Sequence, residues 1–397
     1  MTLNVLFPQP HQGAAEVLAA DFEAATGGKI NPTIVPYDEV ATKLTLDAQS
    51  GANTFDAVDT FYINVGALAE DGVLADITDW IEGNPDINAA DFITSIYDPY
   101  SLKDGRRYGL PFDGDTHVLF YNEEILQRNG ITEPPKTWDE YLEDVKKITE
   151  AEKANGVYGA AILGQKSPVI LGSSYVNRLA GYGGVFIGPD GQPALDTEAA
   201  VQAAQALVDV APYALPTPQE TAFDQALPAF LNGQVAFIEF WTDLGTYAEG
   251  PDSKIKGKWG VTSLPTGGSN TTPLAALNAG FVMGVTEATP KKDCALEFIK
   301  FAASPEENLK LITTTGSGID PIRLSTLNGP EYAAFNSKVQ AAAATALNGA
   351  LAWPTNPQAP KLFQVLTDEL SAVLDGQITP EEAIAKVQEA WKSEIGG

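Results

Sequence analysis

In an open parallel sheet, ligands bind beyond the carboxyl ends of the strands, so residues that follow short apolar runs are the first candidates for chemistry. In this chain those residues are aromatic rings, carboxylates, an amide, hydroxyls, a histidine and one arginine. Such a mixture suits a ligand rich in hydroxyl groups, because aromatic faces cover C–H patches while polar side chains satisfy the hydroxyls. His11, Gln12, Thr60, Tyr62, Trp241 and Thr242 follow an expected strand. Asp113, Asp115 and Gly280 precede one, and Arg323 ends a glycine-containing stretch between expected helices.

Each candidate also has a structural interpretation. Asp113 and Asp115 flank a glycine, and aspartates in turns commonly cap the local backbone. Trp241 can belong to the core, and the two histidines can be ordinary surface or hydrogen-bonded residues. Arg323 can cap the preceding loop or pair with one of the many carboxylates. Residue types alone leave these alternatives open.

Catalysis is not predicted. Glycoside hydrolysis needs two carboxyl groups on opposite sides of the scissile bond, and Asp113 and Asp115 are neighbours on one short turn. The chain has no G-x-S-x-G elbow, and neither histidine has a nucleophile nearby in the sequence. We therefore expect no catalytic residue.

Neither a metal nor a cofactor is expected. One cysteine and two histidines are too few for a usual zinc site, and neither C-x-x-C nor H-E-x-x-H occurs. The glycines at 183–184 and 316–318 form neither G-x-G-x-x-G nor a phosphate-binding loop. The net charge of −28 excludes nucleic acids and anionic membrane surfaces as partners. No stretch is predicted to cross a membrane, since the long uncharged run 260–286 is interrupted by proline, glycine and polar residues.

Alternating apolar and helical patterns predict an α/β protein. The first 71 residues alternate strand and helix, as in a parallel open sheet, and no flexible linker separates the chain into independent halves. Strands are expected at 3–7, 29–35, 55–59, 118–121, 158–163, 235–240, 259–262 and 281–285, and helices at 14–26, 38–50, 65–71, 137–154 and 380–395.

Several stretches resemble one family. The run 108–126, YGLPFDGDTHVLFYNEEIL, and the following PKTWDEY are similar to "G-x-P-x-x-x-D-x-x-x-x-x-Y-N" and "P-x-T-W-x-E" of the extracellular solute-binding proteins of ABC importers. FDAVD, GQVAF, PEE and TTTGSGIDPIR match further stretches in the same order. The resemblance is to the carbohydrate-binding family that includes maltose-binding protein, and it covers nearly the whole chain.

The resemblance implies two α/β lobes, each with an open sheet flanked by helices, joined by a three-crossing hinge with the ligand in the cleft between them. The N-terminal lobe would take residues 1–113 and 281–320, and the C-terminal lobe 117–277 and 323–397, with crossings near 113–117, 277–281 and 320–323. The family's ligand positions fall on the candidates named above, and Trp353 is a further candidate. Lys166 is also a candidate, although its loop lacks a clear family pattern.

The implied function is reversible capture of a carbohydrate, with delivery to the membrane permease of an ABC importer by a monomeric protein. Few aromatic residues among the candidates favour a monosaccharide or linear polyol over a longer oligosaccharide. The chain starts without a basic, apolar leader, so it is either cytosolic or the mature form of an exported protein; the resemblance favours a periplasmic or extracellular location. The alternative is a cytosolic carbohydrate-active enzyme or a sugar-sensing receptor subunit with the same two lobes.

Overall fold

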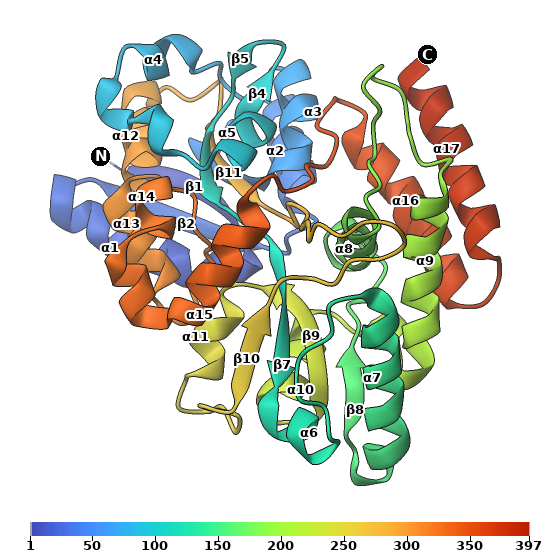
Figure 1. Ribbon diagram of the computed structural model, residues 1–397. Coiled ribbons are helices and arrows are strands. Elements are labelled where there is room, and N and C mark those ends of the chain that lie inside the picture. The colour runs from blue at the N-terminus through green and yellow to red at the C-terminus, as the bar shows by residue number, and fades with distance from the viewer. Residues whose placement is uncertain (1, 397) are drawn as a thin grey trace. The chain divides into compact units, whose positions relative to one another are not determined.

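The computed structural model describes residues 2–396, which divide into two compact units (Figure 1). The chain passes between the units several times, so each unit contains segments that are far apart in sequence. Unit 1 comprises Met1–Asp115, Ala279–Gln340 and Ala352–Pro360, and unit 2 comprises Thr116–Asn278, Ala341–Leu351 and Lys361–Gly397.

Unit 1 is built on a five-stranded sheet in the order β2-β1-β3-β11-β6. β1 is parallel to β2 and β3, whereas β11 runs antiparallel to β3 and β6. In β1, Val5, Leu6 and Phe7 are all fully buried, since a central parallel strand is covered on both faces. The strands are β1 (Thr2–Pro8), β2 (Lys29–Val35), β3 (Ala57–Phe61), β6 (Leu110–Asp113) and β11 (Phe281–Val285), and β4 (Leu102–Lys103) pairs with β5 (Arg106–Arg107) in a hairpin.

Helices cover both faces of this sheet (Figure 1). α1 and α12 pack against each other and against strands, while α2 and α3 close an apolar cluster with Leu6, Val58 and Val282 of the sheet. α1 ends at Gly27, whose φ of 73° is the left-handed conformation that favours glycine. The helices are α1 (Gln12–Thr26), α2 (Val40–Gln49), α3 (Val65–Glu70), α4 (Thr78–Glu82), α5 (Thr94–Ser101), α12 (Lys292–Ala302), α13 (Pro305–Ile312) and α14 (Leu324–Leu327).

Unit 2 is built on a four-stranded sheet in the order β10-β7-β9-β8. β9 is parallel to β8 and antiparallel to β7, so the carboxyl end of β9 meets the amino end of β7: His117 pairs with Trp241. The strands are β7 (His117–Asn122), β8 (Tyr158–Ala161), β9 (Val235–Trp241) and β10 (Trp259–Thr262).

Several helices of unit 2 lie against this sheet or against one another (Figure 1). α7 begins with the expected capping box: the Thr137 side chain accepts from the backbone N–H of Glu140, and the Glu140 carboxylate accepts from that of Thr137. The helices are α6 (Glu123–Arg128), α7 (Trp138–Glu152), α8 (Ser173–Gly181), α9 (Glu198–Val210), α10 (Phe223–Leu231), α11 (Leu244–Ala248), α16 (Ala359–Leu374) and α17 (Pro380–Gly396). α15 (Pro330–Leu347), with non-helical backbone at Asn336, carries the chain from unit 1 into unit 2.

All eight expected strands are present within a few residues of their expected limits, and the fold class is α/β as expected. The division of the chain differs from the expected one after residue 320. Residues 323–340 and 352–360 belong to unit 1, because Arg323 donates to Ala303 and Trp353 donates to Tyr62. The third passage between units therefore lies at 340–341.

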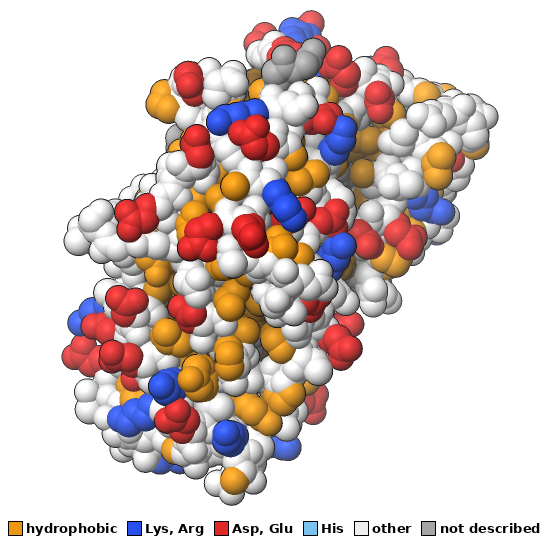
Figure 2. Space-filling model, turned by 90° about the vertical axis from the view of Figure 1, so that its right-hand side faces the viewer, with side chains coloured by type: hydrophobic (Ala, Val, Ile, Leu, Met, Phe, Trp, Pro, Cys, Tyr) orange, Lys and Arg blue, Asp and Glu red, His pale blue; other side chains and the backbone are white. Residues whose placement is uncertain are grey.

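Among residues 2–396, no helix combines the length and the apolar character needed to cross a membrane. Acidic side chains are spread over the face shown in Figure 2, and the basic ones are scattered among them.

Candidate functional site

One buried histidine organises the end of the unit 1 sheet. The Nδ1 atom of His11 lies 2.6 Å from Oδ2 of Asp59, and its Nε2 atom lies 3.1 Å from Oδ2 of Asp113. All three side chains are essentially inaccessible to solvent. Because both ring nitrogens face a carboxylate oxygen, the imidazolium form can donate to both sides at once.

Two opposing effects set the protonation of this group. Burial alone would lower the pKa of His11, but Asp59 and Asp113 outweigh it and raise the pKa to about 10. Burial also raises the pKa of Asp59 to about 6, although the neighbouring His11 opposes this rise. The folded protein therefore holds a proton on His11 at neutral pH.

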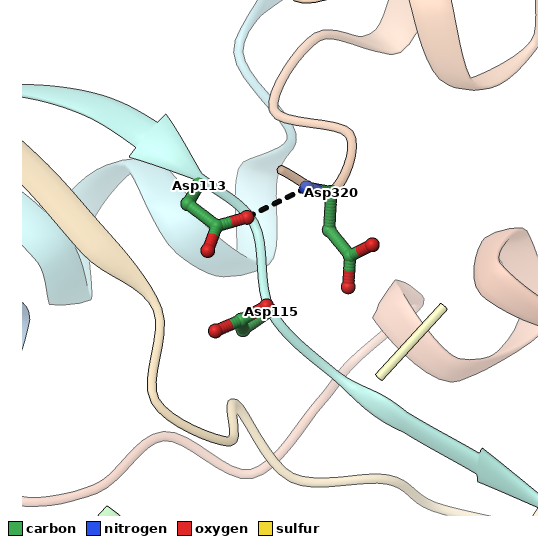
Figure 3. Close-up of side chains that lie close together, drawn as sticks. All are labelled: Asp113, Asp115 and Asp320. Atoms are coloured by element: carbon green, nitrogen blue, oxygen red, sulfur yellow. Dashed lines mark hydrogen bonds between the residues drawn. The ribbon is translucent and has the colours of Figure 1, made fainter. Parts of the chain in front are cut away.

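Asp113 also belongs to a cluster of buried carboxylates with Asp115 and Asp320 (Figure 3). One ligand atom from each of the three lies within 4.8 Å of the others. Asp113 is held in place, since its Oδ1 accepts the backbone N–H of Asp320 at 2.6 Å while Oδ2 contacts His11. We call Asp113, Asp115 and Asp320 the carboxylate cluster. It can accept several hydrogen bonds from a ligand's hydroxyl groups.

Two stacked tyrosines adjoin the carboxylate cluster. The rings of Tyr62 and Tyr100 are 4.5 Å apart and nearly parallel. Burial raises the pKa of Tyr100 well above its usual value, and the three cluster carboxylates raise it further, so its hydroxyl keeps its proton. Among the described residues this hydroxyl has no hydrogen-bond partner. It lies against Gly280, where a Cβ atom would come within 1.6 Å of it, so this position requires a glycine.

In unit 2, Trp241 stands at the carboxyl end of β9, as its position after the apolar run predicts. Its Nε1–H already donates to the carbonyl oxygen of Asn278 at 2.8 Å, and the side chain is buried. This N–H is therefore already paired within unit 2. The indole packs at right angles against the ring of His117, with the ring centroids 4.4 Å apart.

Arg323 has mainly backbone partners, as its structural interpretation allows. Its guanidinium donates to the carbonyl oxygens of Ala303, Ile87 and Asn88, and stacks on Phe92 at 3.6 Å. The side chain is 1 % exposed. Every nitrogen of the group thus donates to backbone, which fits a structural role for Arg323 better than a ligand contact. Arg323 joins three segments of unit 1.

Two other candidates lie on the surface, outside these clusters. The side-chain amide of Gln12 donates to Glu16 one turn along α1. Lys166 is half-exposed and forms an ion pair with Asp368 at 2.8 Å. A surface pair of this kind contributes little to stability. Neither contact suggests a ligand site.

The remaining candidates are buried. The backbone N–H of Trp353 donates to the Tyr62 hydroxyl, and its indole packs edge-on against Phe61. Thr60 lies in β3 with no hydrogen-bond partner for its hydroxyl among the described residues. Thr242 is buried directly after β9. Trp353 and Thr60 thus belong to the unit 1 group, and Thr242 adjoins Trp241.

Sequence reasoning missed several members of these groups. Asp59 and Asp320 stood inside stretches that were considered, but nothing local distinguished them from capping aspartates. Tyr100 lies in α5, away from any strand end, so the rule used to choose candidates could not select it. His117 directly precedes the expected strand 118–121, and this position is a usable signal.

Known proteins resemble this chain in sequence. Residues 8–309 match the family described as bacterial extracellular solute-binding proteins. A probable amino-acid ABC transporter periplasmic-binding protein, y4oP of Sinorhizobium fredii, is 27% identical and is aligned over 94% of this chain and 84% of its own length. The diacetylchitobiose-binding protein DasA of Streptomyces coelicolor is also 27% identical, with the same two coverages.

Solved structures share the fold. A solute-binding protein from Agrobacterium radiobacter K84, crystallised in complex with ribitol, superposes with a TM-score of 0.87 at 24% sequence identity. The superposition covers 99% of this chain and 98% of the other.

Proposed function

Because this chain belongs to the bacterial extracellular solute-binding proteins, we propose that it binds a linear polyol or small carbohydrate and delivers it to the permease of an ABC importer. The protein binds its solute outside the cytoplasm, and no covalent bond of the solute is formed or broken. A solute that contacts one conformation more favourably than others shifts the population toward it. The permease would then recognise the solute-bound conformation.

The carboxylate cluster is the observation that carries this proposal. Asp113, Asp115 and Asp320 are buried together beside the stacked pair Tyr62 and Tyr100. Carboxylates accept hydrogen bonds from hydroxyl groups, and aromatic rings cover the C–H faces of a sugar or polyol. We assign Asp115 to the solute because it lies in this buried cluster at a position where the resemblance implies a ligand contact.

Relatives support a polyhydroxylated solute. DasA is named for diacetylchitobiose, and the Agrobacterium protein was crystallised with ribitol. The relative y4oP is named instead for amino-acid transport, which makes amino acids the comparison class in any binding screen.

We expect at least one of ribitol, D-mannitol, D-tagatose or maltose to raise the melting temperature of the purified protein. A solute that binds only the folded state stabilises it by RT ln(1 + [L]/Kd), about 2.7 kcal/mol at a hundredfold excess over Kd. Differential scanning fluorimetry measures the shift, and calorimetry gives the affinity. The twenty amino acids form the control panel. Stabilisation by an amino acid, with no effect of any sugar or polyol, would overturn the proposed solute class.

Asp115→Asn is expected to weaken binding of the best probe at least tenfold. The substitution keeps the size of the side chain but removes the charge, and a hydrogen bond to a charged group contributes about 1.5–3 kcal/mol. Asp86→Asn is the matched control, because Asp86 is exposed on the same unit and should leave the affinity unchanged. Equal affinities in both variants and the wild type would remove Asp115 from the site.

A further inference from the structure

The orientation of two buried amides in unit 2 can be deduced from one backbone N–H. The backbone N–H of His117 can only donate, and it lies 3.2 Å from Oδ1 of Asn278. The other end of that amide, Nδ2, therefore faces Oδ1 of Asn177 at 3.1 Å and the carbonyl oxygen of Ser173 at 3.3 Å. Both of these atoms are acceptors, as this orientation requires.

The same reasoning fixes the next amide. Since Oδ1 of Asn177 accepts from Asn278, its Nδ2 group faces the Glu239 carboxylate at 2.9 Å and Nδ1 of His117 at 2.9 Å. The Glu239 carboxylate is in turn held by two hydrogen bonds from the buried Arg178. The amide N–H of Asn177 is therefore the donor toward the histidine ring.

His117 is consequently fixed in one protonation state. Its Nδ1 accepts a hydrogen bond, so the single proton of the neutral ring is on Nε2. Burial lowers the pKa of His117 to about 3, which keeps the ring neutral at physiological pH. The network thus presents an N–H donor of fixed direction.

Nothing among the described residues accepts this hydrogen bond. The Nε2 atom is buried, and buried donors in proteins are nearly always paired. A second buried group, the hydroxyl of Ser173, is also without a partner, and Ser173 is linked to His117 through Asn278. His117 begins β7 and lies beside Trp241 at the carboxyl end of β9. Open α/β sheets bind ligands beyond the carboxyl ends of their strands.

We infer that His117 is a solute-binding residue, whose Nε2–H donates to an oxygen atom of the bound polyol or carbohydrate. This inference rests on the proposed function. Because the ring can only donate at Nε2, the site selects solutes with an acceptor oxygen at this point.

Two substitutions of His117 distinguish the effect of the Nε2–H donor from that of the rest of the ring. His117→Gln places an amide N–H near the position of Nε2, whereas His117→Asn reaches only the position of Nδ1. With the best probe among ribitol, D-mannitol, D-tagatose and maltose, calorimetry should show affinity within about threefold of wild type for the glutamine variant. The asparagine variant should bind at least tenfold more weakly. Melting curves without solute verify that both variants fold.

A direct measurement on the unsubstituted protein does not depend on the variants. The chain has two histidines, so ¹⁵N-histidine NMR gives two rings to assign. We expect His117 to be neutral with its proton on Nε2, and its Nε2 resonance to move when the probe is added. A proton on Nδ1, or unchanged affinity in both variants, overturns the inference. Binding of no probe by the wild-type protein instead overturns the proposed function, and the role of His117 with it.

Discussion

Arg323→Ala is expected to lower the free energy of unfolding by about 3–5 kcal/mol, because each buried acceptor left without its donor costs about 1–3 kcal/mol. The carbonyl oxygens of Ala303 and Ile87 would lose their donor in unit 1, and that of Asn88 would keep only the backbone N–H of Asp91. The ring of Phe92 would lose the guanidinium that covers it. Urea denaturation monitored by tryptophan fluorescence measures the loss.

Arg106→Ala is the matched control. Arg106 is exposed and pairs with the surface carboxylates of Asp76 and Asp79, so its removal should cost under about 1 kcal/mol. The affinity of folded Arg323→Ala protein for its solute should remain within a few fold of wild type. Lost affinity at unchanged stability would restore the ligand-binding interpretation and contradict the contacts described above.

Arg323 illustrates why the site was harder to predict than the fold. The strands and several helices follow from local signals, such as the apolar run 235–240 and the capping box at Thr137. What a long polar side chain contacts depends on segments that lie far away in the sequence. The carbonyl of Ile87 that Arg323 binds is 236 residues distant, and a backbone acceptor has no residue type by which a sequence could mark it.

The carboxylate cluster also depends on residues that are far apart in the sequence. Asp113 and Asp115 were predicted from their position just before an expected strand, but their third partner lies about two hundred residues later. Tyr100 was not predicted at all, because its contribution comes from stacking on Tyr62. Asp113 and Asp115 could be chosen as candidates from their residue type. Asp320 and Tyr100 could not, because only the fold of unit 1 brings them close to these two residues.

The second large effect concerns pH. We expect the protein to lose stability as pH rises from about 7 to about 10, because the folded state holds a proton on His11 that the unfolded state has released. Burial opposes this proton, but Asp59 and Asp113 raise the pKa of His11 from 6.5 to about 10. A raised pKa contributes stability that is complete below 6.5 and is lost by the time pH reaches the folded value.

The expected slope follows from one proton. Between the two pKa values the folded state binds one proton more than the unfolded state, so the free energy of unfolding falls by up to about 1.4 kcal/mol per pH unit. The raised pKa of Asp59, about 6, acts in the same direction at lower pH, since the folded state again holds its proton more tightly. Urea denaturation at pH 7, 8, 9 and 10 measures the slope.

Two variants assign the slope to one ring. His11→Gln removes the titrating group between Asp59 and Asp113, so the decline between pH 7 and 10 should become clearly shallower than in the wild type. His117→Gln is the matched control: the pKa of His117 is lowered from 6.5 to about 3, so the folded ring is neutral throughout that range. The unfolded ring is nearly neutral from pH 8 upward, so its loss should leave the slope between pH 8 and 10 unchanged. Lysine and tyrosine titration near pH 10 is common to all three proteins and cancels in the comparison. Parallel slopes for wild type and His11→Gln would mean that the folded protein does not hold the His11 proton, and the two carboxylates would then need another source of positive charge.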